Sequence, residues 1–118
     1  MQPESEKAVQ REVFLAFWKV HILHHAAEEG VVGLWMLDEL RRHGYEVSPG
    51  TLYPMLHRME RLGWLEGSSD KPWHSKARRC YRITAEGRRV LRRITGQLRE
   101  LSGERAGSKE NKNGDNSP

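Results

Sequence analysis

The sequence of 118 residues contains one cysteine, Cys80, so no internal disulfide can form. A chain without a disulfide framework suits a reducing compartment. Long apolar segments are also missing, since the longest run, Gly30–Leu37 with glycine counted, is far shorter than the roughly 20 residues of a membrane span. The N-terminal segment MQPESEKAVQREVF is polar and mixed in charge, unlike a secretory signal. These absences predict a soluble, cytoplasmic protein with no membrane partner.

Catalytic motifs are absent as well. The sequence has no glycine-rich phosphate loop, no nucleophile elbow and no pair of carboxylates in an apolar setting. We therefore expect no enzyme activity, no cofactor and no metal. Cys80 stands beside Arg79 and Arg82, which could lower the pKa of its thiol and make it a redox sensor. A buried or incidental thiol is the favoured interpretation.

What the sequence has is positive charge, and its distribution is uneven. Lys and Arg number 20 against 16 Asp and Glu, a formal net charge of +4. Between residues 71 and 93 there are nine basic residues and one acid, whereas residues 26–47 hold five acids and two basic residues. One end of the folded domain should therefore be basic and suited to a polyanionic partner.

Composition divides the chain into three parts. Residues 1–9 are predicted to be a flexible N-terminus, residues 10–102 a single domain, and residues 103–118 a disordered tail. In the tail Ala106 is the only apolar residue, so burial cannot offset the entropy lost on ordering.

Hydrophobic periodicity within the domain predicts four helices and a hairpin, a mainly α fold with a small β-hairpin. The first helix spans about Gln10–Glu28 and the second about Gly33–His43. Ser48 is the expected N-cap of the third, with Pro49 at its first position and Gly63 at its end. The strands are expected at 64–68 and 79–83, and Thr84 is expected to cap the last helix.

The order of these elements is that of a winged helix-turn-helix, and several motifs strengthen the match. The run 45–60, YEVSPGTLYPMLHRME, closely resembles the recognition-helix signature of the PadR family of bacterial transcriptional regulators. Gly63-Trp64-Leu65 and the run 79–87, RCYRITAEG, are similar to that family's wing. The resemblance implies a winged helix-turn-helix with an additional C-terminal dimerisation helix. It also implies a regulator of double-stranded DNA that is a repressor released by a ligand or signal. The apolar surfaces of the first and last helices predict a homodimer, and two recognition helices about one DNA turn apart predict an inverted-repeat operator. The alternative is a winged-helix protein–protein interaction module without specific DNA binding.

The candidate DNA contacts lie on the third helix and on the wing. Hydroxyls near a helix N-terminus and cations further along suit entry into a major groove, and cations on a hairpin suit phosphates or a minor groove. An ordinary solvated face is the competing interpretation. For Lys71 taken alone, the solvated face and the DNA contact are about equally well supported. The candidates are Ser48, Thr51, Tyr53, Pro54, His57, Arg58 and Arg61 on the helix, and Lys71, Lys76, Arg78 and Arg79 on the wing.

The candidate dimer interface comes from the first and last helices. The apolar surface of the first helix is wider than one side of a small domain needs, so this helix is either central or faces another subunit. The last helix carries a coiled-coil-like apolar seam, and the rest of the same chain offers little for this seam to pack against. The interface residues are Leu15, Trp18, Ile22, Leu91, Ile94, Leu98 and Leu101.

A pocket for an effector is expected at the same interface. Phe14, Trp18 and His21 follow one another along the first helix and could form an apolar cleft for a small, flat aromatic effector. Packing of these rings into the core is the competing interpretation. His21 and His25 lie one turn apart, and with the following glutamates they could bind a metal, although polar groups bordering an interface are the favoured explanation.

Overall fold

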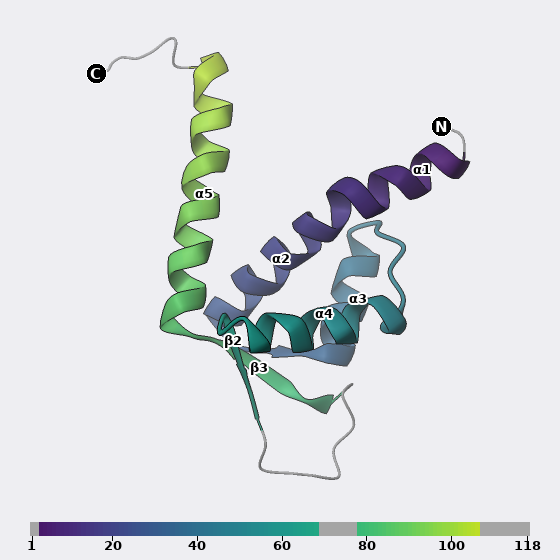
Figure 1. Ribbon diagram of the computed structural model, residues 1–118, viewed down its shortest axis with the longest axis vertical. Helices are drawn as coiled ribbons and strands as arrows, with labels where there is room; N and C mark the ends of the chain where they lie inside the picture. Colours follow the sequence, from purple (N-terminus) through teal and green to yellow (C-terminus); the bar gives the residue numbers. More distant parts are fainter. Residues whose placement is uncertain (1–2, 69–77, 107–118) are drawn as a thin grey trace. The chain divides into compact units, whose positions relative to one another are not determined.

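The computed structural model describes residues 3–68 and 78–106 (Figure 1). The chain divides into two compact units, Met1–Arg88 and Arg89–Pro118. Its elements in order are α1 (Pro3–Val9), η1 (Gln10–Phe14, a π-helical turn), α2 (Leu15–Glu28), β1 (Val31–Val32), α3 (Gly33–Arg42), α4 (Pro49–Arg61), β2 (Leu65–Gly67), β3 (Cys80–Ile83) and α5 (Ala85–Ala106). In the described residues no helix is both long enough and apolar enough to cross a membrane.

The two ends of the chain correct the sequence prediction. Pro3–Val9 form a helix where a loose segment was expected, and this helix continues through η1 into α2 (Figure 1). Glu4 and Glu6 in its first turn and Lys7 in its last turn favour it, because these charges complement the helix dipole. At the other end α5 continues to Ala106, past the expected start of the tail at Gly103. Residues 107–118 lie outside the described residues.

The core of the first unit is formed where α2, α3 and α4 meet the sheet. Apolar residues at helical spacing put one face of each helix inside, and β2 and β3 add Leu65 and Tyr81. The buried helix residues are Trp18, Ile22, Leu23 and Ala26 on α2, Met36, Leu37 and Leu40 on α3, and Leu52, Met55, Leu56 and Met59 on α4. The α3–turn–α4 pair is thereby held as the predicted helix-turn-helix.

The sheet has one strand more than the predicted hairpin. Its order is β1-β3-β2 and both pairings are antiparallel, with Val31 opposite Tyr81 and Leu65 opposite Ile83. The hairpin of β2 and β3 is confirmed. β1 is only two residues long, so period-2 alternation could not reveal it, although two β-branched valines follow Gly30.

Thr84 and Gly87 attach the start of α5 to the end of α4. The Thr84 hydroxyl accepts a hydrogen bond from the Gly87 N–H at 2.9 Å, as the predicted cap requires, and it donates to the Gly63 carbonyl at 2.5 Å. Gly63 has φ +85°, a left-handed conformation that ends α4 as predicted. Gly87 is buried, and a Cβ at this position would overlap the Trp64 carbonyl. Only glycine permits this close approach.

Candidate nucleic-acid interface

The start of α4 is built by Ser48 and Pro49. Ser48 is extended (φ −106°, ψ 157°), and its carbonyl accepts the backbone N–H groups of Thr51 at 3.1 Å and Leu52 at 3.0 Å. Its hydroxyl donates to Thr51 Oγ1 at 3.3 Å instead of capping the helix. Pro49 occupies the first turn, where a missing N–H costs nothing. The two hydroxyls therefore lie together at the positive end of the helix dipole.

The predicted DNA-contacting residues of α4 share the face opposite the core. Leu52, Met55, Leu56 and Met59 are buried on one side of this helix. On the other side the structure brings together the exposed residues Thr51, Pro54, His57, Arg58 and Arg61, with Tyr53 half-buried at the edge. Pro54 lies one turn inside the helix, as expected for a position where the loss of one backbone bond is tolerable.

The wing residues have different environments. Arg78 is exposed, so its guanidinium is accessible to a phosphate. Arg79 stays a predicted DNA contact; within the protomer its Nη2 donates to Glu60 Oε2 at 2.8 Å and its guanidinium lies 5.7 Å from the centre of the Tyr81 ring. Lys71 and Lys76 lie outside the described residues.

Glu60 joins the recognition helix to both strands of the wing. Its Oε2 also accepts the backbone N–H of Gly67 at 3.2 Å, so one carboxylate oxygen contacts β2 and the residue that precedes β3. A side chain at position 67 would overlap the guanidinium of Arg79, so a larger residue there would require the Arg79 side chain to shift. Tyr81 is buried beneath, and this burial raises the pKa of its phenol despite the opposing effect of Arg79. We call Glu60, Gly67, Arg79 and Tyr81 the wing junction.

The wing junction gives a prediction for stability. Glu60 and Arg79 are 24% and 33% exposed, so water screens their attraction only in part. A double-mutant cycle of Glu60→Ala and Arg79→Ala should give a coupling free energy of about 1 kcal/mol in urea unfolding. The matched control is the exposed pair His24–Glu28, whose side chains are 3.4 Å apart and 58% and 59% exposed; its coupling should be near zero. Equal coupling in both pairs would show that the junction contributes no more than a surface contact.

The predicted dimer residues separate into two groups. Trp18 and Ile22 are 2% and 0% exposed inside the first unit, so their side chains face the protomer's own core and not a second subunit. This corrects the prediction, because the first helix is central within the domain. Leu15, Leu91 and Ile94 are half-buried. Leu98 and Leu101 are 47% and 62% exposed, which is unusual for leucines spaced at helical intervals along one seam.

The three residues predicted to line an effector pocket surround a ring of the same chain. The Tyr45 ring, from the turn after α3, lies 5.2 Å from Phe14, 5.8 Å from Trp18 and 5.8 Å from His21 between centroids. The space between these side chains is therefore filled by Tyr45, which corrects the prediction. Burial lowers the pKa of His21, and the nearby His43 and His25 lower it further.

Glu39 was not singled out in the sequence, yet it is the buried charged residue of the described core. Its carboxylate pairs with Arg42 on the same helix and with His43 directly after the helix, the latter at 3.1 Å, and lies 3.6 Å from His25 Nε2. Burial raises its pKa, but hydrogen bonds from Arg42 and His43 outweigh this and hold the pKa below its usual value. The i+3 and i+4 spacing of these partners was the available signal. In the part of the chain that the structure describes, no group of three or more ligating side chains is arranged to hold a metal.

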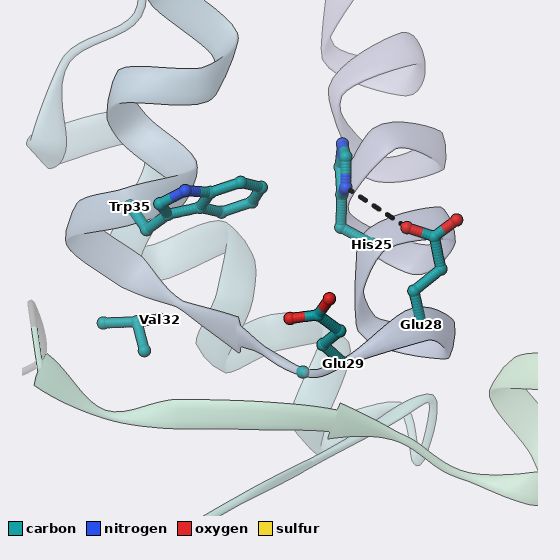
Figure 2. Close-up of a pocket in the computed structure, with 6 residues that line it drawn as sticks. His25, Glu28, Glu29, Val32 and Trp35 are labelled. Atoms are coloured by element: carbon teal, nitrogen blue, oxygen red, sulfur yellow. Dashed lines mark ion pairs between the residues drawn. The ribbon is translucent and has the colours of Figure 1, made fainter.

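A cavity of about 450 Å³ lies between the end of α2, β1 and the start of α3. Figure 2 shows Trp35 and His25 on either side of it with Glu29 below them, and the ion pair between His25 and Glu28. The rings of Trp35 and His25 meet edge to face with centroids 5.1 Å apart, and Trp35 is 46% exposed. The remaining lining residues are Gly30 and Val32. This is an aromatic wall beside carboxylates. The spacing of His25 and the two glutamates at the end of α2 was visible in the sequence, whereas the approach of Trp35 was not.

A family model, a related sequence and two solved structures all match most of this chain. The model of the transcriptional regulator PadR-like family matches residues 22–93. A transcriptional regulator of Mycobacterium tuberculosis is 50% identical over 94 residues, which cover 80% of this chain and 87% of that protein. The crystal structure of a PadR-like transcriptional regulator from Bacillus cereus is similar, with a TM-score of 0.63 and 27% identity over 82% of this chain and 91% of that one. A PadR family regulator from Eggerthella lenta has a TM-score of 0.61 and 26% identity, covering 86% and 92% of the two chains.

Proposed function

Since the chain belongs to the PadR-like family of transcriptional regulators, and is thus a DNA-binding regulator and not an enzyme, we propose that it is a repressor that binds an inverted-repeat operator as a homodimer. A ligand or another signal releases it. The observation that carries the proposal is the exposed face of α4, where Thr51, His57 and Arg58 lie together opposite the buried stripe. A helix held in this way can enter a major groove.

The division of roles follows from the accessibility of each cation. On α4, Arg58 and Arg61 read base edges together with Tyr53, since arginine forms two hydrogen bonds with guanine. On the wing, Arg78 contacts the phosphate backbone and supplies affinity for any sequence. Arg79 is a second proposed phosphate contact, and it also holds the wing in position through its ion pair with Glu60.

Assembly into a homodimer is supported by the exposed leucines of α5. Leu98 and Leu101 continue the seam of Leu91 and Ile94, and a two-fold axis would let the same seam of a second copy cover them. Two recognition helices related by that axis should read half-sites about one helical turn apart, roughly 34 Å, so the operator should be an inverted repeat.

The test of the function is binding to DNA from the region upstream of the protein's own gene. Fluorescence anisotropy at two salt concentrations should show binding that weakens steeply with salt, with one segment bound more tightly than shuffled DNA of equal length. Binding that does not distinguish the two DNAs, or no binding, would instead favour a winged-helix module for protein–protein interaction.

For the effector we propose the cavity of Figure 2, since Tyr45 occupies the position expected from the sequence. The exposed face of Trp35 suits a flat aromatic ring, and the carboxylate of Glu29 beside it favours an amino or other cationic substituent. Its wall includes β1, which pairs with β3 of the wing sheet, so a ligand there can shift the wing.

Trp35→Ala should therefore abolish the effect of such a ligand on DNA binding. We expect planar aromatic amines to bind the wild type and to change its affinity for operator DNA, with the reciprocal change in ligand affinity when DNA is present. Leu34→Ala, at an exposed neighbour outside the cavity lining, is the control and should leave both affinities unchanged. Coupling that persists in Trp35→Ala would place the effector elsewhere.

A further inference from the structure

Three histidines meet where the side chains of α2 contact the turn between α3 and α4, within the first unit. The ring of His21 lies 5.0 Å from that of His43 and 6.4 Å from that of His25, between centroids. We call these three residues the histidine cluster. Neither the DNA-binding face of α4 nor the cavity of Figure 2 includes His21 or His43.

His21 is poorly placed to carry a positive charge. Its side chain is half-buried, and this burial lowers its pKa, as do the nearby imidazoles; Glu39 opposes them without outweighing them. The Glu39 carboxylate is already engaged, because Arg42 pairs with one oxygen and His43 with the other. Among the described residues, the titratable groups that face His21 are His24 and His25 from α2, Glu39 from α3, His43 at the end of α3, and Tyr45 from the turn.

The His21 ring also supports the turn that leads into the recognition helix. It meets the ring of Tyr45 at an interplanar angle of 74°, and Tyr45 packs in addition on Phe14 and Trp18. The backbone N–H of Tyr45 donates to the Leu40 carbonyl at 3.2 Å, so the same residue closes α3. If the His21 ring left this cluster for water, Tyr45 would lose one of its three aromatic neighbours.

We propose that the histidine cluster is a pH-sensitive switch that releases the protein from DNA when its surroundings become acidic. The inference rests on the proposed function, since it adds a signal to the regulated DNA binding. A proton on His21 places positive charge beside His25 and His43 in a half-buried site, and the ring turns out to solvent. The turn before α4 loses the support of that ring, and the recognition helix no longer keeps the orientation that a major groove requires.

The sign of the pH dependence follows from the proton affinities of the folded and unfolded chain. Folding lowers the pKa of His21 from its ordinary 6.5, so the unfolded chain binds this proton more tightly. The free energy of unfolding therefore falls as the pH drops from 6.5 toward the lower pKa of the folded protein. Glu39 acts in a separate range: burial raises its pKa, but hydrogen bonds from Arg42 and His43 hold the pKa below its ordinary 4.5.

His57 provides a control that acts in the opposite direction. It is exposed on the DNA-binding face of α4, outside the histidine cluster. A proton on His57 adds a cation next to the DNA backbone, which strengthens binding as the pH falls. Release of DNA by acid is therefore the reverse of what this surface histidine produces.

The first arm of the test is urea unfolding without DNA at about pH 7.5 and about pH 5.5. The unfolding midpoint should fall on acidification in the wild type and equally in His57→Gln. It should fall less in His21→Gln, which keeps a polar side chain that does not titrate, and in His21→Phe, which keeps a ring against Tyr45. Two variants are used so that a poorly folded His21→Gln protein still leaves a measurement. An equal fall in all of these proteins would show that His21 is not the proton sensor.

The second arm measures operator affinity by fluorescence anisotropy at the same two pH values and constant ionic strength. Wild-type affinity should fall about tenfold on acidification, as expected when about a tenth of the protein keeps α4 in the binding orientation. His21→Phe should keep its affinity, and His57→Gln should lose at least as much as the wild type. Constant or rising wild-type affinity, or an equal loss in His21→Phe, would overturn the switch. A wild type that binds no operator at about pH 7.5 would overturn the proposed function, and the switch with it.

Discussion

Arg58→Ala should lower the affinity for operator DNA by about 10- to 100-fold, the range expected when one bidentate contact to a base is lost. The Arg58 side chain is exposed on α4 and makes no hydrogen bond or ion pair with any residue that the structure describes. Its removal should therefore leave the free energy of unfolding unchanged within about 0.5 kcal/mol. Anisotropy with the operator and with shuffled DNA measures both affinities, and urea unfolding measures the stability.

The comparison with the wing separates specificity from general affinity. Arg78→Ala should weaken binding to operator and shuffled DNA by the same factor and reduce the salt slope by about one. Arg99→Ala, at an exposed arginine of α5 outside the proposed DNA-binding face, is the control for loss of charge alone. If Arg58→Ala weakens operator and shuffled DNA equally, then Arg58 contacts phosphate and the specificity must come from other side chains of α4.

Leu98→Glu should convert the homodimer into a monomer at micromolar concentration. Leu98 is 47% exposed in the protomer, and in the proposed dimer it lies in the middle of the seam, where a carboxylate would be buried without a partner. Light scattering should report half the mass of the wild type, and operator binding should fall with it because both half-sites can no longer be held at once.

A matched control is available at the neighbouring position. Gln97→Glu introduces the same charge on an exposed residue beside the seam, so it should leave the mass and the operator affinity of the wild type unchanged. Should the unmodified chain itself scatter as a monomer, the dimer would be wrong. A dimeric Leu98→Glu protein would place the interface outside this seam.

Signals confined to a few neighbouring residues predicted the secondary structure closely. Pro49 and Gly63 bound α4 as expected, and Thr84 caps α5 through the predicted hydroxyl. These features work within one turn of backbone, where φ, ψ and a single hydrogen bond decide the outcome. The N-terminal helix was missed although its charges favour it, because a polar segment with few apolar residues is typical of a loose end as well.

The roles of individual side chains depended on partners that are distant in the sequence. The seam of α5 and the wide apolar surface of the first helix both indicated an interface, yet Trp18 and Ile22 proved to be core. Periodicity shows that one face of a helix is apolar, but it does not show whether the same chain or a second chain covers that face. Arg79 likewise has the charge and the position of a wing cation. Only the structure showed that it forms an ion pair with Glu60, 19 residues away.

The sequence alone thus determined the order and type of most elements, the helix-turn-helix, the basic wing and the cations on the exposed face of α4. The hydrophobic period, the capping residues and the S-P-G-T-L-Y-P run are local signals. They predict the same elements in any tertiary arrangement that buries the apolar faces of the helices. Only the tertiary structure decided that Tyr45 fills the aromatic cluster, that Glu39 is buried among basic side chains, and that Trp35 and Lys7 each border a cavity. The two cavities, the Tyr45 cluster and the Glu60–Arg79 ion pair arise where distant segments meet, and the spacing of residues along a chain does not encode those meetings.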